Sequence, residues 1–132
     1  MSTLPTDRSY TESHEWLRPQ DDGTYVLGIT DHAQSALGDV VFVETRPVGT
    51  ALEAGGSVAV VESVKAASDV YTPFAAEIIA CNDRLGSSPE LLNQDPYSDG
   101  WIVRLRPRGT DDVSRGLLDA AAYEGRLGDG HG

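Results

Sequence analysis

The chain is poor in cysteine and has no long apolar segment. Its 132 residues include a single cysteine, Cys81, so an internal disulfide is excluded. No apolar run approaches the roughly 18 residues that a membrane-spanning helix requires. The first residues, MSTLPTDRSYTES, have neither the apolar core of a signal peptide nor the arginine-rich pattern of a transit peptide. These absences predict a cytoplasmic protein with no membrane contact, in which Cys81 follows an apolar run and is a buried strand thiol.

Basic residues are also scarce. Lysine and arginine together number 10 against 21 aspartate and glutamate residues, which gives a formal net charge of −11. Nucleic-acid binding is therefore excluded, because phosphate contacts need clustered basic side chains, and anionic membrane surfaces are disfavoured for the same reason. The acidic surface either serves solubility alone or speeds docking to basic patches on partner proteins.

The residue patterns of common enzymes and metal sites are missing too. The three histidines, His14, His32 and His131, occur without an HExxH, a CxxC or an acidic calcium loop, so no metal site is predicted. Cys81 has no histidine partner within a motif, and no GxSxG sequence is present. The glycines of residues 49–56 fit neither a phosphate-binding nor a dinucleotide-binding motif. The chain lacks the groups of a self-sufficient enzyme, and we expect none.

Short runs of β-favouring residues, separated by turn residues, are abundant. They occupy residues 24–30, 40–44, 57–64, 75–81 and 100–107. In the last run Trp101, Val103 and Leu105 alternate with Ile102, Arg104 and Arg106, which places the two sets on opposite faces of a strand. The spacing, with glycine and proline between the runs, predicts a mainly β fold, either an antiparallel sandwich or a flattened barrel.

Helices are expected to be few. Residues 30–38 predict one that Thr30 and Asp31 open and Gly38 ends, and residues 89–93 predict a single turn. A longer C-terminal helix is predicted over about residues 110–124, with Thr110 as its N-cap, Asp111 and Asp112 in its first turn and an apolar stripe from Val113. We expect a single domain over residues 1–127 and a disordered tail over residues 128–132.

Lysine is the rarest basic residue, because Lys65 is the only one in the chain. Arginine serves solubility equally well, but it cannot replace a primary amine that must be acylated. Lys65 lies between two β-favouring runs, which predict a hairpin over about residues 57–73 with the lysine at its tip, although the turn has no glycine, asparagine or proline. At this point Lys65 is either an ordinary surface charge or a modified residue.

Four segments in order resemble the glycine cleavage system H protein family. They are YTESHEWL (10–17), GITDHAQSALGDVVFVE (28–44), VESVKAASDVYTP (61–73) and LLNQDPYSDGWIVRLRP (91–107). The resemblance implies a lipoyl-domain-like barrel-sandwich hybrid of two antiparallel sheets with short helices and a C-terminal helix. It also implies that Lys65 is the lipoyl attachment site, with lipoate bound covalently as N6-lipoyllysine.

The same resemblance implies a carrier and not an enzyme. The arm would take an aminomethyl group from the glycine decarboxylase (P protein) to the aminomethyltransferase (T protein), and electrons to dihydrolipoamide dehydrogenase (L protein). Lipoylating enzymes would be further partners. A monomer in the bacterial cytoplasm, able to visit each enzyme in turn, is the corresponding expectation.

The resemblance also implies roles for five further residues, each inferred from its matching position. Ser13, Glu15 and Asp69 match residues that line the cleft receiving the arm in this family, and His32 would border that cleft. Glu62, three residues before the lysine, matches a position used in recognition by the lipoylating enzyme. One residue departs from the pattern. Ala76 stands eleven residues after the lysine where the family usually has glycine, so strain is expected there if the backbone needs a positive φ.

Other functions remain open on the residues alone. An H-like protein that donates lipoate to 2-oxoacid dehydrogenases would keep the same lysine. A scaffold that has lost the cofactor would not need the intact sequence ESVKA around it. A biotin carrier is disfavoured, because that family usually flanks its lysine with methionine and Met1 is the only methionine here.

Overall fold

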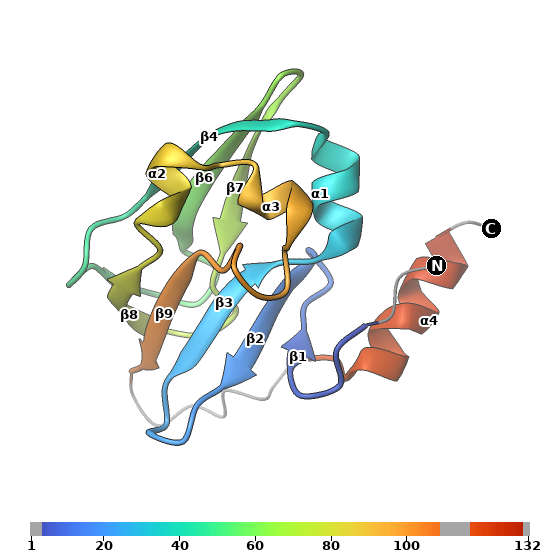
Figure 1. Ribbon diagram of the computed structural model, residues 1–132. Helices are drawn as coiled ribbons and strands as arrows, with labels where there is room; N and C mark the ends of the chain where they lie inside the picture. The colour runs from blue at the N-terminus through green and yellow to red at the C-terminus, as the bar shows by residue number, and fades with distance from the viewer. Residues whose placement is uncertain (1–3, 109–116, 131–132) are drawn as a thin grey trace.

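The computed structural model describes residues 4–108 and 117–130, and within them nine strands form two antiparallel sheets (Figure 1). The larger sheet has the order β1 (Ser9–Tyr10), β2 (Glu15–Pro19), β3 (Tyr25–Ile29), β9 (Val103–Pro107), β8 (Ala76–Cys81) and β5 (Ala51–Leu52). The smaller sheet has the order β4 (Val40–Thr45), β6 (Ser57–Ser63) and β7 (Ala67–Tyr71). The helices are α1 (Asp31–Leu37), α2 (Arg84–Ser87), α3 (Leu91–Gln94) and α4 (Ala120–Gly130). The predicted mainly β class is confirmed.

The core lies between the two sheets. Both sheets contribute fully buried side chains to one apolar cluster, among them Leu17, Leu27, Val58, Val61, Ile78 and Leu105. Because successive side chains of a strand point to opposite faces, Trp16 and Val26 lie on the other face of the large sheet. There they form a second cluster with Tyr10 and with Tyr123 of α4. The C-terminal helix thus lies beside β1 (Figure 1) and packs against the large sheet through Tyr123.

Each predicted strand run contains a strand, with two local differences. The alternation placed Ile102 on the same face as Arg104 and Arg106, but Ile102 is fully buried: its N–H pairs with Leu27 O at 2.8 Å and its side chain joins the core. Cys81 lies in a strand as expected, but the prediction of a buried thiol is wrong. Cys81 is half-buried at the end of β8, where its Sγ lies 3.4 Å from Arg46 O.

Helix α1 has the predicted ends. The Thr30 side chain accepts a hydrogen bond from the Ala33 N–H at 3.2 Å, and so satisfies one of the free N–H groups of the first turn. Gly38 ends the helix with φ of 82°, a left-handed conformation that favours glycine, and its N–H donates to Gln34 O at 3.0 Å. Helix α3 supplies the predicted turn near residues 89–93, and α2 is an addition that the sequence pattern did not indicate.

Helix α4 begins later than the predicted range of 110–124. Leu118 pairs with Tyr10 through two hydrogen bonds of 2.7 Å, which keeps this segment extended. Asp119 then caps the helix, since its carboxylate accepts from the Ala122 N–H at 2.8 Å. Residues 128–130, expected in the disordered tail, belong to the helix. The predicted cap and first turn at residues 110–113 lie outside the described residues, as do residues 131 and 132.

Ala76 causes no backbone strain. Among the described residues His14 is the one non-glycine residue with a positive φ, so Ala76 has an ordinary strand conformation. It pairs with Leu52 and Pro107, and its methyl group is fully buried in the core. The expected cost of replacing the family glycine is therefore absent.

Candidate functional site

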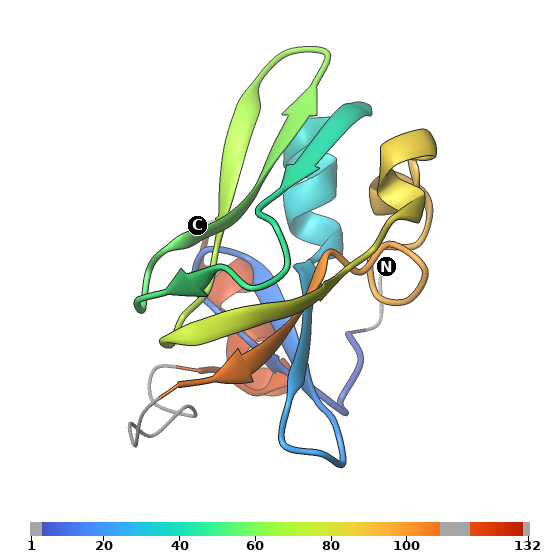
Figure 2. The same ribbon diagram turned by 90° about the vertical axis from the view of Figure 1, so that its left-hand side faces the viewer.

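Lys65 is exposed at the tip of a long hairpin that projects beyond the rest of the chain (Figures 1 and 2). Strands β6 and β7 pair antiparallel up to Glu62 and Ala67, as the sequence predicted. Ser63 closes the turn, because its N–H donates to Ala66 O at 2.7 Å and its Oγ accepts from the Ala66 N–H at 3.1 Å. A serine that bonds the backbone a few residues on is a known turn former, and this was the overlooked sequence signal.

The hairpin tip rests beside the end of α1. The Val64 N–H donates to Asp39 O at 3.1 Å, which ties the tip to the segment between α1 and β4. A methyl group added at Gly38 would lie 3.5 Å from Lys65 Cε, so the lysine stem passes close to this glycine. The hairpin tip is thus anchored through the backbone of Val64, while Lys65 itself stays open to solvent.

A cavity of about 200 Å³ lies between α1, β7 and the loop of residues 11–15. Its lining includes Ser13, Glu15 and Asp69, the three cleft residues inferred from the resemblance, together with His14, Leu37 and Val61. A second cavity of about 300 Å³ also includes Ser13 and Glu15, with Thr11, Tyr71 and Pro73 among its lining. The fold thus brings residues from five separate segments to one place near the hairpin.

Glu15 is the best-bonded acid of this site. It is 3% exposed. Its Oε1 accepts hydrogen bonds from the hydroxyls of Thr11 and Ser13, the latter at 2.6 Å, and its Oε2 accepts from the Tyr71 N–H at 3.2 Å. None of the ion pairs within residues 4–108 and 117–130 involves Glu15. The donors that the described residues give this carboxyl group are thus hydroxyls and a backbone N–H, and none of them is a cation.

The other predicted residues lie at different distances from the cavity. Asp69 is exposed on β7, and its Oδ1 accepts from Ser57 Oγ at 3.0 Å. His32 is outside the lining, but its ring lies on that of His14, with centroids 4.4 Å apart. Glu62 is exposed on β6 beside the tip and does not line the cavity, which is consistent with a contact to another protein.

His14 and Tyr123 are site residues that sequence reasoning missed. The Nδ1 of His14 lies 2.7 Å from the Tyr123 hydroxyl, although 109 positions separate the two residues. Burial, with a further contribution from His32, lowers the pKa of His14 from its usual 6.5. Burial also raises the pKa of Tyr123 to about 12, so its hydroxyl is protonated at neutral pH. No local pattern indicates this pair, because only the docking of α4 joins them.

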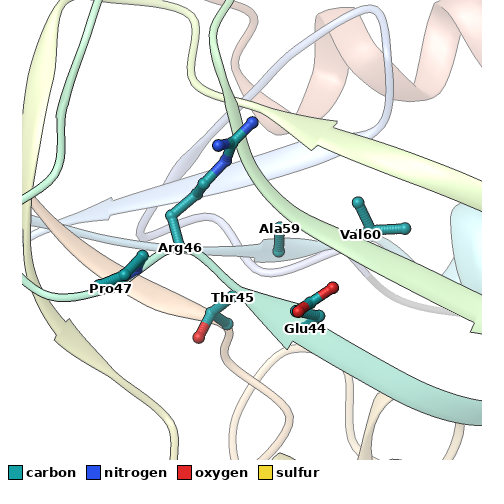
Figure 3. Close-up of a pocket in the computed structure, with 6 residues that line it drawn as sticks. All are labelled: Glu44, Thr45, Arg46, Pro47, Ala59 and Val60. Carbon is teal, nitrogen blue, oxygen red and sulfur yellow. The ribbon is translucent and has the colours of Figure 1, made fainter.

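A further pocket, of about 340 Å³, lies along β4 and β6 (Figure 3). Its lining consists of Glu44, Thr45, Arg46, Pro47, Ala59 and Val60. None of the predicted site residues belongs to it, so it is separate from the cavity beside α1.

Comparison with known proteins shows to which family the chain belongs. The sequence model of the family described as "Glycine cleavage H-protein" matches residues 8–129. The chain belongs to this family. It is 54% identical over 129 residues to the glycine cleavage system H protein of Klebsiella pneumoniae, covering 98% of this chain and 99% of that one. It is 53% identical over 127 residues to the H protein of Pseudoalteromonas atlantica, with coverages of 96% and 98%.

A solved H protein supports the same fold. The crystal structure of the H protein from Mycobacterium marinum superposes with a TM-score of 0.84 at 38% identity, covering 95% of this chain and 99% of that one. Membership makes the chain a lipoyl carrier of the glycine cleavage system and not an enzyme. No helix within the described residues is both long and apolar enough to cross a membrane.

Proposed function

We propose that Lys65 carries lipoate in amide linkage and that the chain passes an aminomethyl group between two enzymes in the bacterial cytoplasm. The exposed lysine at the tip of a hairpin, beside a cavity with a buried carboxylate, is the observation that carries this proposal. An acylating enzyme needs an amine that it can surround, and the tip offers the sole lysine of the sequence in that position.

The chain's own residues fit such a group. When bound, the lipoyl group would supply a disulfide whose opening provides one sulfur for the aminomethyl group and which, as the dithiol left after unloading, stores two electrons. Glu15, with no cationic partner in the described part of the chain, would pair with the amine, and Asp69 lines the same cavity. The Ser13 hydroxyl, now bonded to Glu15, would hold that carboxylate in place. A cavity wall of Leu37 and Val61 would limit the access of water to the bound group.

The partners follow from this role. A glycine decarboxylase would load the arm, an aminomethyltransferase would unload it, and dihydrolipoamide dehydrogenase would reoxidise the dithiol. A lipoylating enzyme would first acylate Lys65 and read Glu62 beside it. The net charge of −11 suits brief, charge-steered encounters with basic surfaces on these enzymes, and a monomer can make them in turn.

Intact-mass measurement after treatment with a lipoylating enzyme tests the attachment. We expect one lipoyl adduct on the wild-type chain and none on Lys65→Arg. The matched control is the double variant Lys65→Arg with Arg46→Lys, which places the single lysine on another exposed residue. It should remain unmodified, because the hairpin tip and not exposure alone directs the reaction. An adduct on this control would contradict the assignment of the site.

Glycine–bicarbonate exchange with a purified glycine decarboxylase tests the carrier role. Lipoylated wild-type protein should support exchange, and the unlipoylated protein should not. Lipoylated protein that gives no exchange, but donates its lipoyl group to a 2-oxoacid dehydrogenase, would replace this proposal with the lipoate-relay function.

A further inference from the structure

The backbone of His14 has an unusual conformation beside the cavity. Its φ of 74° lies in the left-handed region, which residues other than glycine seldom adopt. The His14 N–H donates to Thr11 O at 3.1 Å, and its carbonyl accepts from the Thr30 N–H at 3.0 Å. This turn lies directly between Ser13 and Glu15. Whatever holds His14 in place therefore also orients the hydroxyl and the carboxylate that face the cavity.

The His14 side chain ends on the C-terminal helix. The Tyr123 hydroxyl lies 2.7 Å from His14 Nδ1 and 2.8 Å from Thr30 Oγ1. Thr30 is fully buried and Tyr123 is 1% exposed, so water does not compete for these bonds. The Tyr123 ring also stacks on that of Tyr10, with centroids 4.9 Å apart. One hydroxyl of α4 thus joins the loop of residues 11–15 to the N-cap of α1.

The hydrogen bonds of Thr30 decide which group donates in each bond between Thr30, Tyr123 and His14. The Thr30 Oγ1 already accepts a hydrogen bond from the Ala33 N–H. For the hydroxyl proton of Thr30, the Tyr123 oxygen is the one acceptor among the described residues. A fully buried hydroxyl without an acceptor is costly, so Thr30 donates to Tyr123. The Tyr123 proton then goes to His14 Nδ1. This requires a neutral imidazole with its proton on Nε2.

We propose that Tyr123 is a positioning residue for the arm cavity, which keeps His14 in the Nε2–H form and so holds Ser13 and Glu15 in place. The lowered pKa of His14 agrees with a neutral ring. Glu15 on β2 and His32 on α1 act on the charge of this ring, Asp31 and Tyr97 act on Tyr123, and Asp69 of β7 lines the same cavity. The tautomer does not depend on lipoylation, whereas the effect on the bound arm rests on the proposed function.

Nitrogen-15 NMR of the histidine rings in the unlipoylated protein tests the tautomer directly. In the wild type, His14 Nδ1 should have the shift of an unprotonated nitrogen and Nε2 that of a protonated one. Tyr123→Phe should give a mixture of tautomers and raise the pKa of His14 by about half to one unit, the equivalent of one ordinary hydrogen bond. A proton on Nδ1 in the wild type would overturn the proposal even if no variant folds.

Tyr10→Phe is the matched control. It removes a hydroxyl from the same ring stack, but that hydroxyl donates to Pro5 O and not toward the cavity. We expect Tyr10→Phe to leave the tautomer and pKa of His14 unchanged. With aminomethyl-loaded protein, Tyr123→Phe should shorten the lifetime of the loaded state about three- to ten-fold and Tyr10→Phe should not. Equal effects of the two variants on His14 would refute a specific role for Tyr123.

If the tautomer behaves as expected but the wild-type chain cannot be loaded, the proposed function fails and the positioning of His14 stands. If the chain is loaded normally and Tyr123→Phe leaves both His14 and the lifetime unchanged, the positioning role fails alone.

Discussion

Replacing Glu15 by glutamine tests the chemistry of the cavity with little change in shape. The carboxylate accepts from two hydroxyls at Oε1 and from the Tyr71 N–H at Oε2. A glutamine oxygen can keep the Tyr71 bond, while its NH₂ group donates to Thr11 and Ser13, whose hydroxyls can rotate to accept. The variant should therefore fold with a loss of at most about 1–3 kcal/mol, and it loses the negative charge.

The charge decides the lifetime of the loaded carrier. In a buried site, a hydrogen bond to a charged group contributes about 1.5–3 kcal/mol of stabilisation. At about 1.4 kcal/mol for each factor of ten in rate, the loss of this bond predicts spontaneous release of the aminomethyl group that is roughly 10- to 150-fold faster. Water enters more easily where the amine is no longer paired, which acts in the same direction.

The assay follows aminomethyl-loaded protein by intact mass at neutral pH after the decarboxylase is removed. Glu44→Gln is the control, because it removes the same charge from an exposed residue of β4 outside the cavity. A release rate of Glu15→Gln within two-fold of wild type, with an unchanged circular dichroism spectrum, would refute a protective role for this carboxylate.

Three further results are expected. Gly28→Ala should lower the free energy of unfolding by about 1–3 kcal/mol in urea titrations, because its methyl group would lie 2.5 Å from the buried Trp16 ring. Ser63→Ala should slow lipoylation about five-fold, measured by mass, since the turn loses a hydrogen bond of about 1 kcal/mol. The pKa of His14 is lowered on folding, so the unfolded chain binds its proton first. Stability should therefore fall as the pH drops through the unfolded value of 6.5, and His14→Asn should flatten that dependence in thermal unfolding.

For each of these three predictions, a specific result would contradict the reasoning. Gly86→Ala, where a methyl group meets nothing within 4 Å, should leave stability unchanged or slightly higher, and an equal loss there would remove the packing argument. Unchanged lipoylation of Ser63→Ala would mean that the partner enzyme shapes the turn itself. A pH dependence that His14→Asn does not alter would assign the effect to other groups.

Local patterns were sufficient for much of the fold. Alternating runs bounded by glycine and proline predict strands, because a strand with one buried face repeats every two residues. Thr30 and Gly38 predict the ends of α1, because a cap bonds within its own turn. The rarity of Lys65 and the motif around it needed no structure, since both are properties of the sequence itself.

Other features required contacts between distant segments. The start of α4 follows from the pairing of Leu118 with Tyr10, which no helical pattern in residues 110–124 reveals. Ala76 looked strained by comparison with the family, yet its backbone is ordinary and its methyl group fills the core. The half-buried state of Cys81 likewise depends on where β8 ends against its neighbours.

The sequence by itself determined most of the strands, the first helix and a hairpin that carries the one lysine, because these depend on residues close together in the chain. Only the tertiary structure decided that Ser13, Glu15 and Asp69 face one cavity, and that Tyr123 holds His14 from 109 positions away. The physical reason is that a buried charge or hydroxyl is placed by whichever partner the packing brings to it, and packing joins segments that sequence order keeps apart.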